Sequence, residues 1–187
     1  MNGTTVSRPR GAVAGRLLLA ALEIDAHPAP VTGPAGWQLL LDTPTGVGTA
    51  AAFHAQVWYR VAGPNEPPSY TWSVPNGAWT DIALMVYGNV NSSSPIDVSA
   101  GRDAGVTAAP GTPSVTTRFP NERLVAVFIG FDYRPWIASS GMTQRFAFDS
   151  ITAQEIVQPI PGATGTKEAA SAQPTRVSAQ IIALRGR

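Results

Sequence analysis

The fold class is decided by the stretch FHAQVWYRV (Phe53–Val61), in which apolar and polar residues alternate. One face would carry Phe53, Ala55, Val57, Tyr59 and Val61, and the other would carry His54, Gln56, Trp58 and Arg60. A period of two is typical of a β-strand that buries one of its faces. SYTWSV (Ser69–Val74) alternates in the same way. Both stretches therefore predict half-buried strands.

Glycine and proline separate similar stretches along the whole chain, with 18 glycines and 17 prolines. Short apolar runs at even spacing between such turn residues are typical of a β-sandwich or barrel. The predicted strands are Arg16–Asp25, Trp37–Leu41, Phe53–Val61, Ser69–Val74, Thr80–Tyr87, Pro113–Arg118, Arg123–Phe131, Thr143–Phe148, Gly162–Ala170 and Arg176–Leu184. We expect an all-β fold, an antiparallel two-sheet β-sandwich of jelly-roll or Ig-like shape with about ten strands.

Two of these stretches, RLLLAALEI (Arg16–Ile24) and RLVAVFIGF (Arg123–Phe131), are apolar on both faces, as expected of central strands. Each is followed by a turn in which glycine precedes a large apolar residue, PAGW (Pro34–Trp37) and SSGM (Ser139–Met142). Two explanations stay open. The chain contains two related halves, or it uses one kind of hairpin chemistry twice.

The two turns predict structural plugs rather than a binding motif. Glycine readily adopts the positive φ of a tight turn, which accounts for Gly36 and Gly141. Trp37 and Met142, which follow them, would then close the ends of the core.

A length of 187 residues suits one domain. We separate residues 1–14 as an N-terminal arm from a single β-sandwich domain at 15–187. The segment Gly88–Ser114 is rich in Gly, Ser, Asn and Pro, and predicts a long excursion with one short strand at Ile96–Ser99. Arg16 interrupts the first apolar run, so this run predicts a strand rather than a secretory signal. No run reaches the ~18 apolar residues of a membrane-spanning helix.

The composition restricts the partners. Charged residues make up only 13% of the chain, about half the usual share, which suits a surface partly covered by other chains. The net charge of +1 gives no electrostatic basis for binding nucleic acid or an anionic membrane. Cysteine is absent from the sequence, which excludes disulfides and thiolate chemistry. Twelve arginines stand against the single Lys167, a bias that coding composition explains and that protein interfaces also favour.

The sequence resembles a group of small β-sandwich proteins found in bacteriophage genomes, among virion structural genes, and in some bacterial secreted proteins. The most specific pieces are PAGW (Pro34–Trp37), WYRVAGPNEPPSYTW (Trp58–Trp72) and PSVTT (Pro113–Thr117). The resemblance implies a structural or binding role without catalysis, such as a capsid-decorating, tail-associated or host-surface-binding protein. Members of the group usually have an acidic residue where this chain has Arg16, a departure that bears on an interface.

No residue pattern predicts an enzyme. The two histidines, His27 and His54, lie in a Pro-flanked loop and on the polar face of a strand, and no G-x-S-x-G elbow is present. Asp25 and Asp132 end the two central strands at matching places, where solvated strand-end acids are the simplest explanation. The sequence predicts no catalytic residue, no metal site and no cofactor.

Aromatic and arginine side chains in predicted loops are the interface or ligand candidates. They are Tyr133, Arg134, Trp136, Trp79, Arg8 and Arg10. Exposed aromatic and Arg side chains are typical of interface hot spots. Three interpretations of the segment DYRPWIASS (Asp132–Ser140) stay open: a lid on the core, a protein interface, or a ligand platform.

The resemblance therefore implies a non-enzymatic bacteriophage virion structural protein, which we expect to attach to the capsid or tail through its loops and N-terminal arm. The expected partners are other virion proteins and copies of the chain itself, and the expected location is the virion. The alternative is a carbohydrate- or host-surface-binding β-sandwich module, with a host-surface glycan as its partner.

Overall fold

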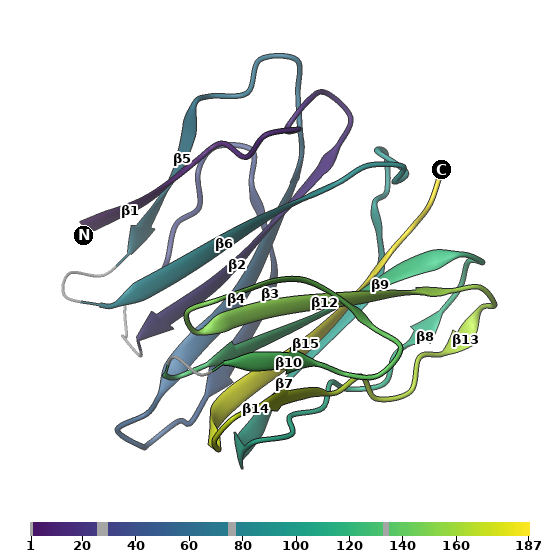
Figure 1. Cartoon of the computed structure of the whole chain (residues 1–187). Coiled ribbons are helices and arrows are strands. Elements are labelled where there is room, and N and C mark those ends of the chain that lie inside the picture. Colours follow the sequence, from purple (N-terminus) through teal and green to yellow (C-terminus); the bar gives the residue numbers. More distant parts are fainter. Residues whose placement is uncertain (1, 26–29, 75–77, 133–134) are drawn as a thin grey trace.

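The computed structural model describes residues 2–25, 30–74, 78–132 and 135–187. Within these ranges the chain forms fifteen β-strands and no helix (Figure 1). They are β1 (Asn2–Ser7), β2 (Leu17–Asp25), β3 (Gln38–Thr45), β4 (Phe53–Val61), β5 (Ser69–Val74), β6 (Thr80–Tyr87), β7 (Ile96–Thr107), β8 (Thr116–Thr117), β9 (Glu122–Gly130), β10 (Trp136–Ala138), β11 (Thr143–Phe148), β12 (Ile151–Gln158), β13 (Gly162–Ala163), β14 (Ala169–Ser171) and β15 (Thr175–Leu184). In the described ranges, no helix has the length and apolar character needed to cross a membrane.

Two antiparallel sheets form the sandwich, which confirms the predicted all-β class (Figure 1). The four-stranded sheet has the order β3-β4-β2-β6, and the five-stranded sheet has the order β11-β12-β9-β15-β7. The main core lies between them and draws on β2, β4 and β6 from one sheet and on β9, β12 and β15 from the other. The strand count exceeds the predicted ten because short strands pair outside the two main sheets.

Additional strands cover the outer faces of both sheets. The ribbon β1-β5 packs Tyr70 and Trp72 against Leu18 and Leu22 on the outer face of the four-stranded sheet. On the five-stranded sheet, Trp136 of β10 belongs to a second outer cluster with Phe128. This explains why β2 and β9 are apolar on both sides. It also corrects the expectation that β4 buries one face only, because Trp58 packs in the outer cluster.

The N-terminal segment is part of this covering layer. β1 pairs with β5 along its whole length, from Asn2 opposite Val74 to Ser7 opposite Ser69. Val6 packs against the outer cluster of the four-stranded sheet. The segment 1–14, separated in the sequence as an arm, thus contributes a strand to the domain.

Three strands have no counterpart among the sequence predictions, namely β1, β10 and β12. β12 has a sequence of mixed polar and apolar residues, ITAQEIVQ. Its polar side chains can be buried because they form hydrogen bonds within the protein. Thr152 Oγ1 donates a hydrogen bond to the Phe146 carbonyl at 2.9 Å, and Gln154 Oε1 accepts one from the Ser139 amide at 3.1 Å. β7 is a twelve-residue strand rather than the short strand predicted at Ile96–Ser99.

The two halves of the chain share one strand order. β3-β4-β2-β6 in the first half corresponds to β11-β12-β9-β15 in the second, with strands taken in the same sequence order. The registers correspond as well. One row of facing residues is Gln38–Tyr59–Leu19–Met85, and the matching row is Thr143–Glu155–Val125–Ile182.

Local irregularities repeat at the same places. The β3–β4 ladder shifts register between Leu39 and Leu41, and the β11–β12 ladder shifts between Gln144 and Phe146. Both shifts lie three residues beyond the glycine of the preceding turn. The likeness first visible in two turns therefore extends over four strands of each half.

Candidate functional site

The aromatic residues predicted as interface or ligand candidates do not lie together in the structure. Trp136 is only 7% exposed and packs against Phe128 at 6.3 Å between ring centroids, so it covers the core. Trp79 is 63% exposed, immediately before β6. Tyr133 and Arg134 lie outside the described residues.

The arginine candidates are exposed near the N-terminus. Arg8 donates from Nη1 to the Glu66 carbonyl at 2.6 Å, which ties it to the loop before β5. Arg10 is exposed. The two arginines do not form one cluster with Trp79 or Trp136 in the contacts of the described residues.

The two turn glycines adopt the same conformation. Gly36 and Gly141 each have a φ of +81°, in the region that favours glycine. Trp37 is buried and packs edge-on to Tyr70 and Trp72, at centroid distances of 5.2 and 5.1 Å. Met142 is half-buried against the outer cluster of the five-stranded sheet. Both side chains thus pack over outer clusters, one on each sheet.

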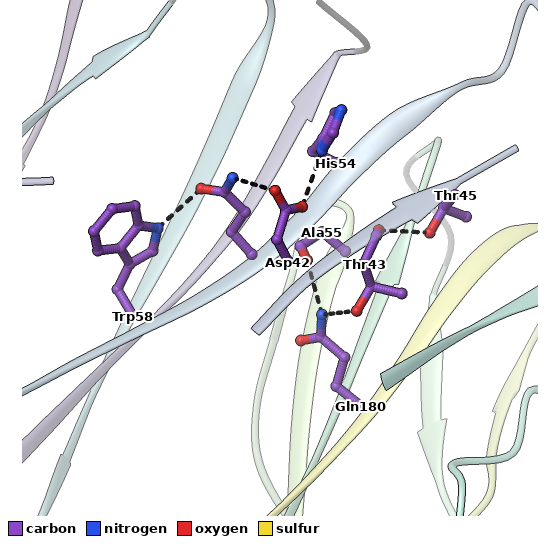
Figure 2. A network of polar contacts seen from close by, with 8 residues as sticks. Asp42, Thr43, Thr45, His54, Ala55, Trp58 and Gln180 are labelled. Carbon is purple, nitrogen blue, oxygen red and sulfur yellow. Dashed lines mark hydrogen bonds and ion pairs between the residues drawn. The ribbon is translucent and has the colours of Figure 1, made fainter. Parts of the chain in front are cut away.

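His54 takes part in a chain of polar contacts between neighbouring strands. His54 Nδ1 lies 2.9 Å from Asp42 Oδ1, and Asp42 Oδ2 accepts a bond from Gln56 Nε2 at 3.1 Å, so this carboxylate links two strands (Figure 2). His27 falls outside the described ranges. Among the described residues, no three His, Asp or Glu side chains are placed to share a metal ion.

A group of acids surrounds Glu23 on the inner face of β2. Glu23 is 2% exposed, and burial, followed by repulsion from Asp25 and Asp81, raises its pKa to about 9. Asp149 and Asp132 add smaller contributions. Asp25 and Asp132, which the sequence matched by position, thus act on the same buried carboxyl. Glu23 is therefore protonated at neutral pH.

One lateral edge of the sandwich is closed. There β3 and β7, the edge strands of the two sheets, contact one another. Gln180 donates from Nε2 to Thr43 Oγ1 at 3.0 Å and to the Ala55 carbonyl at 2.8 Å (Figure 2). Gly101 of β7 allows this approach, because a Cβ there would lie 2.3 Å from Thr43 Oγ1. We call this contact the β3–β7 seam.

The opposite lateral edge is open. β6 and β11 are the edge strands there, and the structure leaves a groove of about 720 Å³ between them. β6 lines it from Ile82 to Tyr87, and Phe146 and Phe148 line it from β11. Phe148 is 73% exposed. We call this site the β6–β11 groove.

Basic residues surround one end of the β6–β11 groove. Arg16, Arg123 and Arg145 line it together with Glu155. Arg123 and Arg145 both donate to Glu155 Oε1, and this contact raises the pKa of Arg145. Three cations thus face one carboxylate, so this end of the groove carries a positive charge. Such a site favours a ligand that brings an acidic group.

The backbone of β6 is available at this edge. The amide of Asp25 donates to the Trp79 carbonyl at 3.1 Å, which identifies a hydrogen-bonded pair of the antiparallel β2–β6 ladder. Pairs alternate in such a ladder, so Asp81, Ala83 and Met85 bond to β2. The amides and carbonyls of the residues between them, Ile82, Leu84 and Val86, point to the open edge.

Sequence reasoning did not identify the β6–β11 groove. Its residues come from four strands and two loops, and only the fold brings them together. One signal was present. Arg16, which interrupts the first apolar run of the sequence, lines this groove.

Comparisons of the chain with protein-family models, with curated proteins and with solved structures found no match.

Proposed function

We propose that the protein is a non-enzymatic structural protein of a bacteriophage virion, which decorates or attaches to the capsid or tail. One observation carries this proposal. The sandwich covers the outer faces of both sheets with its own strands, yet it leaves the β6–β11 groove open beside an exposed phenylalanine. A free sheet edge is a surface onto which another chain can add a strand.

The surface composition supports assembly. Only 13% of the residues are charged, so the surface has few of the charges that keep soluble proteins apart. Large apolar side chains are exposed in several places: Val13, Leu39, Val47, Trp79, Val106, Ile137, Phe148, Val157 and Ile160. These features suit a chain that works in contact with other chains.

The alternative, a module that binds carbohydrate or a host surface, has less support. Such a module would present several solvent-facing aromatic rings as a platform. In the described ranges, Trp37, Trp58, Trp72 and Trp136 are buried, and Trp79 alone among the tryptophans is exposed. The virion role therefore remains the preferred proposal.

The test is whether the chain is a component of particles. Particles from a culture that carries the gene would be purified on a density gradient and probed with antibodies against the chain. We expect the chain to band with the particles at a constant ratio to the major capsid protein. Immunogold labelling would then place it on the capsid or the tail. A chain found only in the soluble fraction would overturn the proposal.

A further inference from the structure

The two halves of the sandwich differ by one strand. In the second half, β15 has a neighbour on each side, β9 and β7. Its counterpart β6 has β2 on one side and, in the described ranges, no strand on the other. The place beside β6 that corresponds to β7 opens onto the β6–β11 groove.

We propose that this place accepts an extended strand from another protein chain, which pairs antiparallel with β6 as β7 pairs with β15. The inference rests on the proposed assembly function and gives it a docking site. β15 pairs with β7 from Thr175 opposite Thr107 to Leu184 opposite Ile96. The matching β6 residues are those whose amides point to the open edge, Ile82, Leu84 and Val86. The backbone therefore offers the same ladder in both halves.

Side chains define what the incoming strand must carry on its outward face. In β7, Val98 and Ala100 pack against the outer cluster of their sheet. Beside β6, the half-buried Ile82, Leu84 and Val86 pack against the other outer cluster. Apolar residues on the incoming strand would extend that cluster, because alternate residues of a strand face the same side.

The inward face requires different residues in the two halves. Gly101 of β7 lies against Thr43, where a side chain has no space. The counterpart of Thr43 in the β11 register is Phe148, which is exposed beside the groove. Farther along the same groove, Arg16, Arg123 and Arg145 line its basic end. The incoming strand is therefore one that alternates apolar residues with acidic residues.

A second copy of this chain fits the charge less well. Antiparallel pairing of β6 with β6 of another copy would supply one acidic residue, Asp81, to a groove lined by three arginines. We therefore assign the groove to a strand of a different protein. A self-associated form is an outcome that the experiment must distinguish.

The experiment uses synthetic peptides on the full chain. The probe has the twelve-residue sequence of β7 with Ser99→Glu and Gly101→Glu, which makes these two inward positions acidic in addition to Asp103. The matched control peptide carries Ser99→Lys and Gly101→Lys. Fluorescence anisotropy would measure affinity, and NMR would follow the amides of Ile82, Leu84 and Val86. We expect saturable binding of the acidic peptide, weaker binding of the basic one, and slowed exchange at those three amides.

Two variants of the chain test the edge itself. Leu84→Pro removes an outward amide without removing a β2–β6 bond, since proline is tolerated where its nitrogen faces away from the ladder. Leu84→Ala removes the same side chain and keeps the amide. We expect Leu84→Pro to bind the acidic peptide about fivefold to tenfold more weakly than Leu84→Ala. Proline removes one hydrogen bond to the peptide, and its ring obstructs the approach of the peptide backbone. Circular dichroism would verify that both variants fold.

Several results would overturn the inference. They are no saturable binding, equal binding by the proline and alanine variants, and equal binding of the acidic and basic peptides. A dimer of the free chain that Leu84→Pro dissociates would replace the foreign strand with a second copy. The particle test remains separate. A chain that bands with particles but binds no peptide would retain the proposed function and lose this docking site.

Discussion

The β3–β7 seam and the β6–β11 groove are corresponding edges of one sandwich, and they differ in what covers them. At the seam, Thr43 is 8% exposed and accepts a hydrogen bond from Gln180. At the groove, its counterpart Phe148 is 73% exposed, and the residue matching Gln180 is Ala83. A polar pair suits an edge that the chain closes itself. An apolar surface suits an edge that another chain closes.

The largest expected effect concerns Glu23, which lies beside Asp81 of the open-edge strand β6. Its counterpart in the second half is Ile129, so the acid is a feature of one half only. The pKa of Glu23 is raised from 4.5 to about 9 in the folded chain. The folded state therefore keeps a proton that the unfolded state loses above its own pKa. Stability falls as pH rises between these two values, by at most about 1.4 kcal/mol per pH unit.

The measurement is urea unfolding of the wild-type chain and Glu23→Gln between pH 5 and pH 8. We expect the wild type to lose up to about 4 kcal/mol relative to the variant over this range. Glu122, whose pKa burial and Asp97 raise to about 7, contributes a similar decline in both chains and cancels in the comparison. Parallel pH profiles for the two chains would contradict this account.

The second prediction compares glycines at the two edges. Gly101→Ala places a Cβ against Thr43 in the closed seam, where the two strands cannot separate without losing contacts. We expect a loss of about 1–3 kcal/mol in the free energy of unfolding. Gly88→Ala is the matched control at the groove, because its Cβ would meet only Arg16, at 3.7 Å or more.

A chemical denaturation curve for each variant gives the result. Gly88→Ala should change stability by less than about 0.5 kcal/mol. Equal effects at the two glycines would mean that the seam is no more tightly packed than the groove.

The third prediction concerns the hydrogen bond across the seam. Thr43→Val keeps the side-chain shape and removes the acceptor for Gln180, while Gln180 retains the Ala55 carbonyl. The expected loss is about 1 kcal/mol. A double-mutant cycle with Gln180→Leu would isolate the pair, and additive effects would show that the two side chains are not coupled.

The seam also shows why the position of a strand in the sequence was easier to predict than the strand that lies beside it in the fold. Alternation in Phe53–Val61 predicted β4, and apolar runs predicted β2 and β9, because each signal is local. β7 was expected to end near Ser99, since glycine and aspartate usually mark loops. Gly101 instead lies within β7, where the absence of a side chain allows β3 to pack closely against it. This contact joins residues that are far apart in the sequence. No local pattern contains that information.

The candidate site was missed for the same reason. Trp136 was considered for an interface because it lies in a predicted loop, yet β10 places it over the core. Phe148 was placed in a predicted strand, where alternation could not tell whether its face would be covered. That depends on whether a strand lies beside β6, which only the sheet order reveals.

The smallest expected effect on stability is at Phe148. Phe148→Ser removes a phenyl group that is already largely in water, so the unfolding free energy of the isolated chain should change by less than about 0.5 kcal/mol. The same variant should weaken binding of the acidic β7 peptide, because the phenyl is apolar surface that the incoming strand would cover. Val47→Ser, an exposed residue outside the groove lining, is the control for both measurements. A destabilised Phe148→Ser chain would mean that the ring already has its partner within the fold. Unchanged peptide binding would mean that the groove does not use it. Only the combination of unchanged stability and weakened binding is expected of an edge that another chain completes.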